Sequence, residues 1–283
     1  MKVDKYYGLC IHSERRKNLE KYEKLLGIEI DTSFSVNGYL HNKQYYIKKN
    51  LVVPDTFMDS GAIGCTLSFY NIYKDIVKNK YKYCIIFEDD IDWNFEFYKD
   101  FNLEAQLEKI DRLYIEWDVF YLGTEAKGKL SNQKHIEDNI YQLECGKISI
   151  PIKNKTYKSF NESIKSNKNL RHRNLGGMQS ILITYKGALE MLKYHNPAYS
   201  ISDGLMAYAI MNGDIKNLAF IPTLFTQLSH PRNISNRLWS SMTGGSVWHS
   251  NETYENVSYN IKKGCSKYPL SNKYNYEHGG NYK

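Results

Sequence analysis

The chain has 283 residues, of which 42% are hydrophobic and 24% are charged, so it can bury a core and has a globular composition. Its formal net charge of +7 comes from basic residues spread along the chain, which argues against nucleic-acid binding as the main function. No apolar run approaches the roughly 20 residues of a membrane-spanning helix, and the polar start does not resemble a signal peptide. We therefore expect a cytoplasmic protein without a membrane span.

The first predicted elements form a β-α-β unit. Residues 6–11 are a short apolar run and predict a strand, and Ser13 is suited to cap the helix that follows. Leu19, Tyr22 and Leu26 recur at helical spacing in that helix. Residues 28–36 predict a second strand.

The alternation continues through the middle of the chain. Ser60 can cap a helix that runs to about Val77, and a strand follows over residues 83–88. Apolar residues spaced 4, 3, 4 and 3 apart predict a helix over residues 97–117, and residues 118–122 predict another strand. This order predicts an α/β fold with a mixed, mostly parallel sheet and helices on both faces.

The second half is less regular. Residues 127–173 are polar and weakly periodic, which indicates an insertion with a hairpin or a flexible loop. Residues 181–184 predict a strand, residues 186–194 a helix, and Ser202 and Asp203 open another helix. Residues 218–225 predict a last strand, at an edge because it contains Pro222. We expect one domain over 1–230 and a C-terminal tail or lid over 231–283.

The cysteines and the overall residue usage are less informative. Five cysteines without a CxxC pair favour neither disulfides nor a zinc knuckle; they are Cys10, Cys65, Cys84, Cys145 and Cys265. The excess of Lys, Asn, Ile and Tyr is typical of AT-rich coding, as in some large viruses and low-GC microbes. A viral origin would place the protein in the host cytoplasm or the virion.

The strand over residues 83–88 runs directly into three carboxylates, Glu88, Asp89 and Asp90. Adjacent acids repel one another unless positive charge lies among them, and a divalent cation that binds a diphosphate is one source of it. An acidic turn solvated by water is the other interpretation. Polar residues also cluster at 13–16, 123–125 and 227–230, where other strands end. Because ligands bind beyond the carboxyl ends of strands in open α/β sheets, this shared placement favours a binding site.

Five segments, in order, resemble motifs of glycosyltransferase family 25. This family includes bacterial lipooligosaccharide β-galactosyltransferases and collagen hydroxylysine galactosyltransferases. The segments are CIHSERR at 10–16, GAIGCTLS at 61–68, IFEDDI at 86–91, WDVFYLG at 117–123 and ITYKGA at 183–188. The family usually has histidine after the motif serine, where this chain has Phe69. The resemblance covers about residues 6–230, and the tail matches none of the family's motifs.

The resemblance implies a GT-A type, Rossmann-like fold and transfer of a sugar from a UDP-sugar donor with Mn²⁺. The collagen-modifying branch implies UDP-galactose and inversion at the transferred carbon, and UDP-glucose stays an alternative. The acceptor would be a protein, such as hydroxylysine of a collagen-like chain, or a glycan.

The acids and arginines receive roles on the same basis. A hard cation that neutralises a departing diphosphate suits Asp90 as the main metal ligand, with Glu88 or Asp89 assisting. His230 is a further candidate ligand, because many GT-A enzymes use a late histidine, although a lone histidine is more often structural. Arg15 and Arg16 can clamp a phosphate or the uracil edge, and one of the two also suits a surface salt bridge.

Inversion needs a general base for the proton of the acceptor hydroxyl. Asp203 matches an acidic residue of the family and is our candidate, although Ser202 and Asp203 also suit a helix N-cap. Glu125, after the strand over 118–122, is the rival candidate.

Four smaller residues complete the predicted donor site. Gly61 and Gly64 either let the backbone approach the nucleotide or serve packing. Ser68 falls in the same motif and equally suits packing or capping. Gly177 can shape the pocket of the donor sugar.

Two other classes of function stay open. A metal-dependent phosphotransferase or phosphodiesterase would also use carboxylates at a strand end, but the sequence has no phosphate-binding G-x-x-x-x-G-K-[ST] loop. A non-catalytic binding module on the same fold is the second alternative. Phe69 favours that module, and the intact acidic motif opposes it.

Overall fold

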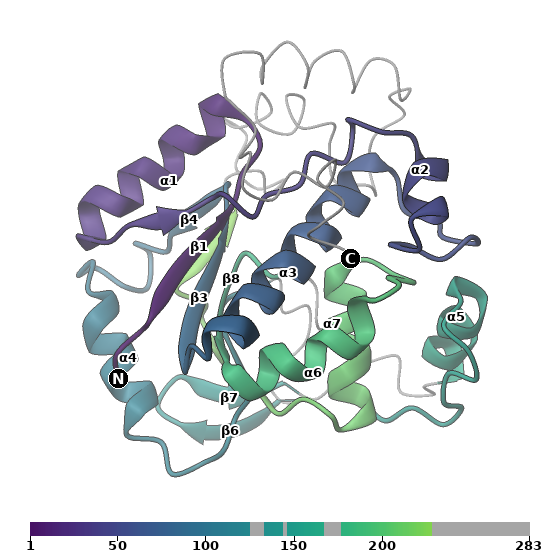
Figure 1. The fold of residues 1–283 in the computed structure, drawn as a ribbon. Coiled ribbons are helices and arrows are strands. Elements are labelled where there is room, and N and C mark those ends of the chain that lie inside the picture. Colours follow the sequence, from purple (N-terminus) through teal and green to yellow (C-terminus); the bar gives the residue numbers. More distant parts are fainter. Residues whose placement is uncertain (125–132, 144–145, 167–176, 228–283) are drawn as a thin grey trace.

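The computed structural model describes residues 1–124, 133–143, 146–166 and 177–227 of the chain (Figure 1). An eight-stranded sheet has the order β2-β1-β3-β8-β5-β9-β7-β6, and β4 and β10 form a separate antiparallel pair. The strands are β1 (Lys5–Leu9), β2 (Ile30–Asp31), β3 (Tyr83–Glu88), β4 (Ile91–Trp93), β5 (Val119–Gly123), β6 (Lys134–Glu137), β7 (Ile140–Gln142), β8 (Ser180–Thr184), β9 (Asn217–Phe220) and β10 (Phe225–Gln227). The helices are α1 (Ser13–Leu26), α2 (Lys43–Lys48), α3 (Ser60–Asn79), α4 (Leu103–Asp111), α5 (Tyr157–Ser166), α6 (Tyr185–His195) and α7 (Ser202–Asn212).

The direction of the strands decides which loops meet. β1 pairs in parallel with β2 and β3, and β5 pairs in parallel with β9. β8 lies between β3 and β5 and is antiparallel to both. The carboxyl ends of β1, β3, β5 and β9 therefore share one edge of the sheet with the amino end of β8. The predicted α/β fold with a mixed, mostly parallel sheet is confirmed.

Two hydrophobic cores lie on opposite faces of the sheet. Along β3, Cys84 and Ile86 face the core under α3, α6 and α7, whereas Ile85 and Phe87 face the core under α1 and α4. The same alternation in β5 and β8 reflects the two-residue period of a strand. Figure 1 shows α3, α6 and α7 crossing the front of the sheet and α1 and α4 at its left. No helix in the described ranges is long and apolar enough to cross a membrane.

Two predicted elements are shorter than expected. β2 contains two residues, because turn hydrogen bonds at Ser33 and Ser35 direct the chain away from the sheet. The helix predicted over 97–117 covers only Leu103–Asp111, because the Asn102 side chain caps it at Ala105. The apolar spacing outside α4 serves other contacts, such as the stacking of Trp117 on Tyr83.

The edge position predicted for the last strand is wrong. Residues 217–227 form two strands, with Pro222 in the turn between them. β9 lies between β5 and β7 inside the sheet. Pro222 lies outside both strands, so it interrupts no ladder of hydrogen bonds.

The helix that carries the GAIGCTLS motif, α3, begins at Ser60 as expected. Its N-cap is Asp59 and not Ser60, because the Asp59 carboxylate accepts from the Ala62 amide.

The polar insertion has more structure than its composition suggests. The predicted hairpin is present as β6 and β7, and α5 is an additional helix. The first two amides of α5, from Tyr157 and Lys158, donate to the carboxylate of Asp55, which lies about a hundred residues earlier in the chain. A cap that comes from another segment leaves no local sequence signal.

A buried histidine ties α6 to the start of α7. His195 is 1% exposed, with Nδ1 3.0 Å from the Met191 carbonyl and Nε2 3.2 Å from Ser202 Oγ. Because a carbonyl only accepts, Nδ1 carries the proton, and neutral Nε2 accepts from the Ser202 hydroxyl. Burial lowers the pKa of His195 to about 4. The neutral ring therefore holds Ser202, the residue before Asp203, by a hydrogen bond.

We predict that His195 makes the protein less stable in acid. Between pH 6.5 and about 4 the unfolded chain binds this proton and the folded chain does not, so the free energy of unfolding falls as the pH falls. His195→Gln should flatten that dependence by about 3 kcal/mol at most. Urea denaturation of both proteins across this window measures it. Parallel pH profiles would contradict the assignment.

Candidate functional site

The acidic motif forms a sharp, buried turn at the end of β3. Glu88 is the last residue of β3, Asp89 and Asp90 form the turn, and Ile91 begins β4. Asp89 and Asp90 are only 7% and 5% exposed. Since a buried carboxylate is costly without a partner, this exposure excludes the interpretation as a solvated acidic turn.

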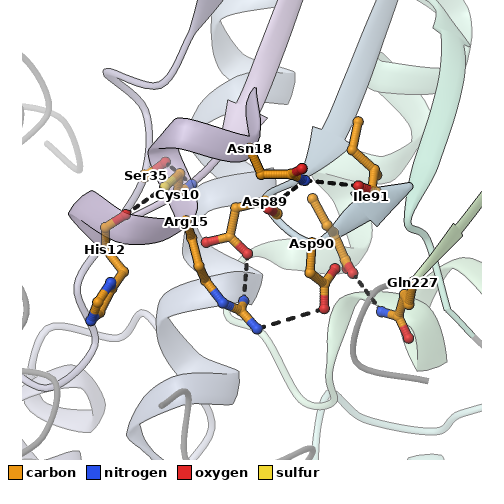
Figure 2. Close-up of polar contacts among 10 residues, drawn as sticks. Cys10, His12, Arg15, Asn18, Ser35, Asp89, Asp90, Ile91 and Gln227 are labelled. Atoms are coloured by element: carbon orange, nitrogen blue, oxygen red, sulfur yellow. Dashed lines mark hydrogen bonds and ion pairs between the residues drawn. The ribbon is translucent and has the colours of Figure 1, made fainter. Parts of the chain in front are cut away.

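Arg15 supplies positive charge to this turn (Figure 2). Its guanidinium lies between the two aspartates, with Nη1 2.5 Å from Asp89 Oδ1 and Nη2 3.6 Å from Asp90 Oδ2. The planar fork of donors in arginine suits such a bridge between two carboxylates. Asp89 is therefore held tightly, whereas Asp90 is held by a longer contact.

The same face of α1 holds the backbone of the turn. Asn18 Nδ2 donates to the carbonyls of Asp89 at 3.1 Å and Ile91 at 2.7 Å. One turn further on, the Tyr22 hydroxyl donates to Asp92 and accepts from the amide of Trp93. Positions 15, 18 and 22 are three and four residues apart and so share one helix face. Sequence analysis missed Asn18 and Tyr22 as site residues, although this spacing marks them.

Two acids of the turn have raised pKa values. Burial raises the pKa of Asp89 to about 6, although Arg15 opposes the shift. The pKa of Glu88 is raised well above its usual value, first by burial and then by Asp90, Asp203 and Asp89. Three carboxyl groups thus lie within electrostatic reach of Glu88, and Arg15 brings one positive charge to Asp89 and Asp90.

Asp203 comes to this cluster from the first turn of α7. Its Oδ2 accepts from the amide of Gly177 at 2.9 Å, and Gly177 lies just before β8 at the same edge of the sheet. The helix is not capped by these residues, because its N-cap is Ile201 and has no side-chain cap. Asp203 therefore serves a tertiary contact, and the N-cap interpretation is wrong.

The two predicted arginines lie in different surroundings. Arg16 pairs within α1, 2.8 Å from Glu23 and 3.8 Å from Glu20, whereas Arg15 points into the acidic turn. One of the two was expected to form a surface salt bridge, and the bridge that Arg16 forms lies within α1. The predicted clamp on a phosphate or the uracil edge stays a prediction.

The residues of the GAIGCTLS motif are packed closely. A Cβ on Gly64 would lie 2.6 Å from the Val36 carbonyl oxygen, and one on Gly61 would lie 2.8 Å from the Tyr39 hydroxyl. The Ser68 hydroxyl donates to the Gly64 carbonyl and accepts from the Val36 amide. Gly64 and Ser68 therefore hold α3 against the segment after β2. Phe69, where the family usually has histidine, is fully buried.

The last described residues also reach the site. Gln227 Nε2 donates to Glu88 Oε2 at 3.1 Å, and β10 places it opposite Ile91 of β4. Sequence analysis did not single out this contact, because the β4–β10 pairing is not visible in either segment alone. Glu125 and His230 lie outside the described residues, so their predicted roles stay predictions.

The acids suit a cation whose coordination is completed by a bound phosphate or by water. Within the described residues, no three Asp, Glu, His or Cys side chains converge as in a protein-only metal site. Mg²⁺-like ions at phosphate sites, however, use one or two carboxylates and take the other ligands from water and phosphate. Asp90 and Glu88 fit that requirement, because Asp90 is held less tightly by Arg15 and the excess of acidic groups favours a cation.

The cysteines within the described residues, Cys10, Cys65 and Cys84, are free thiols.

Comparison with known proteins identifies relatives of the chain. The family model described as "Glycosyltransferase family 25 (LPS biosynthesis protein)" matches residues 9–206. Procollagen galactosyltransferase 1-A of Xenopus laevis is 38% identical over 63 residues, which are 22% of this chain and 10% of that protein. A glycosyltransferase 25 family member of Anopheles gambiae is 29% identical over 143 residues, 47% of this chain and 23% of that protein.

A third relative has a different label. "Probable inactive glycosyltransferase 25 family member 3" of Bos taurus is 33% identical over 66 residues, 23% of this chain and 11% of that protein. The matched segments of these three proteins span between 10% and 23% of their lengths. Similarity therefore extends both to a protein named as a galactosyltransferase and to one described as probable inactive.

We predict that Arg15→Met strongly destabilises the protein near neutral pH. Removal of one partner leaves Asp89 and Asp90 buried without their guanidinium, at a cost of about 3–5 kcal/mol. The loss should be smaller at about pH 5, because Asp89 is then largely protonated in both proteins. Chemical denaturation at the two pH values measures the difference.

Arg16→Met is the matched control, because it removes a neighbouring arginine that pairs with Glu20 and Glu23 of its own helix. Its effect should be smaller and nearly independent of pH over this range. Equal losses in the two variants would show that Arg15 does not stabilise the acidic turn.

Proposed function

Because the chain belongs to glycosyltransferase family 25, as its five motifs predict, we propose that it transfers a sugar from a UDP-sugar donor to an acceptor hydroxyl. The observation that carries the proposal is the cluster of carboxyl groups at the ligand-binding edge of the sheet. Glu88, Asp89, Asp90 and Asp203 bring four acidic groups, and Arg15 is the guanidinium that pairs with two of them. A diphosphate would be repelled by this excess of acidic groups unless a cation bound with it.

The metal belongs to this proposal. Asp90 and Glu88 would hold Mn²⁺, which would neutralise the negative charge of the departing diphosphate. Arg15 keeps Asp89 in place and Asn18 fixes the backbone carbonyls on either side of Asp90, so the turn is already shaped before any ligand binds. Preorganised carboxylates of this kind lose little entropy when the cation arrives.

We propose Asp203 as the general base. The acceptor hydroxyl gives its proton to the carboxylate, the acceptor oxygen attacks the anomeric carbon, and the bond to the diphosphate breaks with inversion. Asp203 Oδ2 is oriented by the Gly177 amide, and its carboxylate lies near enough to raise the pKa of Glu88. Support from geometry is therefore available for Asp203, whereas Glu125 lies outside the described residues.

The donor sugar and the acceptor are proposed from the relatives. Procollagen galactosyltransferases favour UDP-galactose as donor and a hydroxyl of a collagen-like protein as acceptor, with UDP-glucose and a glycan as the alternatives. A non-catalytic UDP-sugar-binding module is the second candidate function. The relative described as "probable inactive" favours it, as does Phe69 in place of the histidine that the family usually has.

One experiment tests the donor and the metal together. Thermal melting with UDP, UDP-galactose and UDP-glucose, each with Mn²⁺ or with chelator, should show stabilisation by one UDP-sugar only when Mn²⁺ is present. Slow release of UDP in the same samples indicates an active enzyme, and binding without release indicates the non-catalytic module. No response to any of these nucleotides would refute both candidates.

Asp90→Asn provides the matched variant for this test. It should weaken Mn²⁺-dependent UDP binding by about tenfold or more and leave the unliganded melting temperature the same or higher, because repulsion in the turn is relieved. Asp92→Asn is its control, since Asp92 contacts Tyr22 and not the acidic turn. Equal UDP affinity in the two variants would contradict the assignment of Asp90.

A separate prediction tests the base. Asp203→Asn keeps an oxygen that can accept from the Gly177 amide, so the fold and UDP binding should persist. Turnover of the donor should fall by about a hundredfold or more, because the proton of the acceptor hydroxyl has no base. Turnover at the wild-type rate would exclude Asp203.

A further inference from the structure

Gln179 lies between the acidic turn and Asp203. It directly precedes β8, and its carbonyl accepts from the amide of Glu88 at 2.8 Å. Its side-chain amide lies beside Gly177, where a Cβ would meet it. The amide of Gly177 donates to Asp203 of α7, so this segment links Gln179 to Asp203.

The amide oxygen of Gln179 has no hydrogen-bond partner in the part of the chain that the structure describes. The residue is 2% exposed, and Oε1 is shielded from solvent with no hydrogen-bond partner among the described residues. A buried amide oxygen without a partner is costly, and native structures keep few of them. A ligand with an O–H or N–H group would satisfy it.

Gly177 makes room for this amide. Its φ is +70°, and a Cβ at this position would lie 2.4 Å from Gln179 Nε2 and 2.8 Å from Oε1. The amide of Gly177 also donates to Asp203. The missing side chain therefore places the Gln179 amide next to the residue that orients the proposed base.

We propose that Gln179 Oε1 accepts a hydrogen bond from a hydroxyl group of the donor sugar. The inference rests on the proposed function. In an inverting transfer the sugar lies between the departing diphosphate and the base, and Gln179 lies between the acidic turn and Asp203. A sugar hydroxyl is the donor group that this arrangement brings to an orphan acceptor.

The test compares affinity for UDP with affinity for the UDP-sugar. Calorimetric titration with Mn²⁺ present uses UDP and whichever of UDP-galactose and UDP-glucose binds the wild type more tightly. Gln179→Met should weaken UDP-sugar binding by about tenfold and change UDP binding by less than about twofold. The unliganded melting temperature should not fall, because methionine has a similar length and removes the unsatisfied oxygen.

Gln106→Met is the matched control. Gln106 lies on α4, under the opposite face of the sheet, and its Oε1 is also buried without a partner in the described ranges. The same exchange there should leave both affinities unchanged. Gly177→Ala should reproduce the selective loss, because the added Cβ displaces the amide of Gln179.

Two results would overturn the proposal. Unchanged UDP-sugar affinity in Gln179→Met excludes the contact with the sugar. An equal loss for UDP and UDP-sugar assigns Gln179 to the nucleotide or the cation instead. A wild-type protein that binds neither ligand refutes the proposed function itself, and that failure is visible before any variant is made.

Discussion

Burial of like charge at the end of β3 is the constraint on which the site depends. Asp89 and Asp90 are almost fully covered, and burial raises the pKa of Asp89 although Arg15 opposes the shift. Arg15 offsets part of this cost, but one guanidinium cannot neutralise four neighbouring carboxylates. The turn therefore keeps an affinity for positive charge in a place where the sheet already directs ligands. The fold tolerates this local cost because two hydrophobic cores on either side of β3 hold the strand.

The position of α1 follows from the same constraint. Arg15 must reach the aspartates, Asn18 the carbonyls of the turn and Tyr22 the start of β4, so one helix face is committed to a segment about 70 residues later. Gln227 of β10 completes the hold on Glu88 from the other side. The turn is thereby fixed by side chains from two distant segments, α1 and β10. Such a site is rigid before a ligand binds, which suits precise placement of a leaving group.

Some of this was predictable from the sequence, for physical reasons. Continuous apolar runs predict β1, β3 and β5, and helical spacing predicts α1, α3 and α6, because those patterns directly reflect burial. The reversal of β8 was not predictable, since pairing direction depends on which strands meet and not on the strand's own residues. The Asp55 cap of α5 and the pairing of β4 with β10 are also long-range. For the site, the acids were visible as a motif, whereas Asn18 and Gln227 act through contacts between segments.

The antiparallel strand gives the site its second half. Because β8 runs against β3, its amino end brings Gly177 and Gln179 to the edge where β3 ends with Glu88. A parallel β8 would have placed its carboxyl end there instead, with Thr184 and the start of α6. The reversal therefore places residues 177–179 next to the acidic turn. Asp203 of α7 contacts the same residues, because it accepts from the Gly177 amide. Under the proposed function, the acidic turn would hold the leaving diphosphate with its cation and Asp203 would receive the proton of the acceptor hydroxyl. The topology of the sheet would then position the sugar between them.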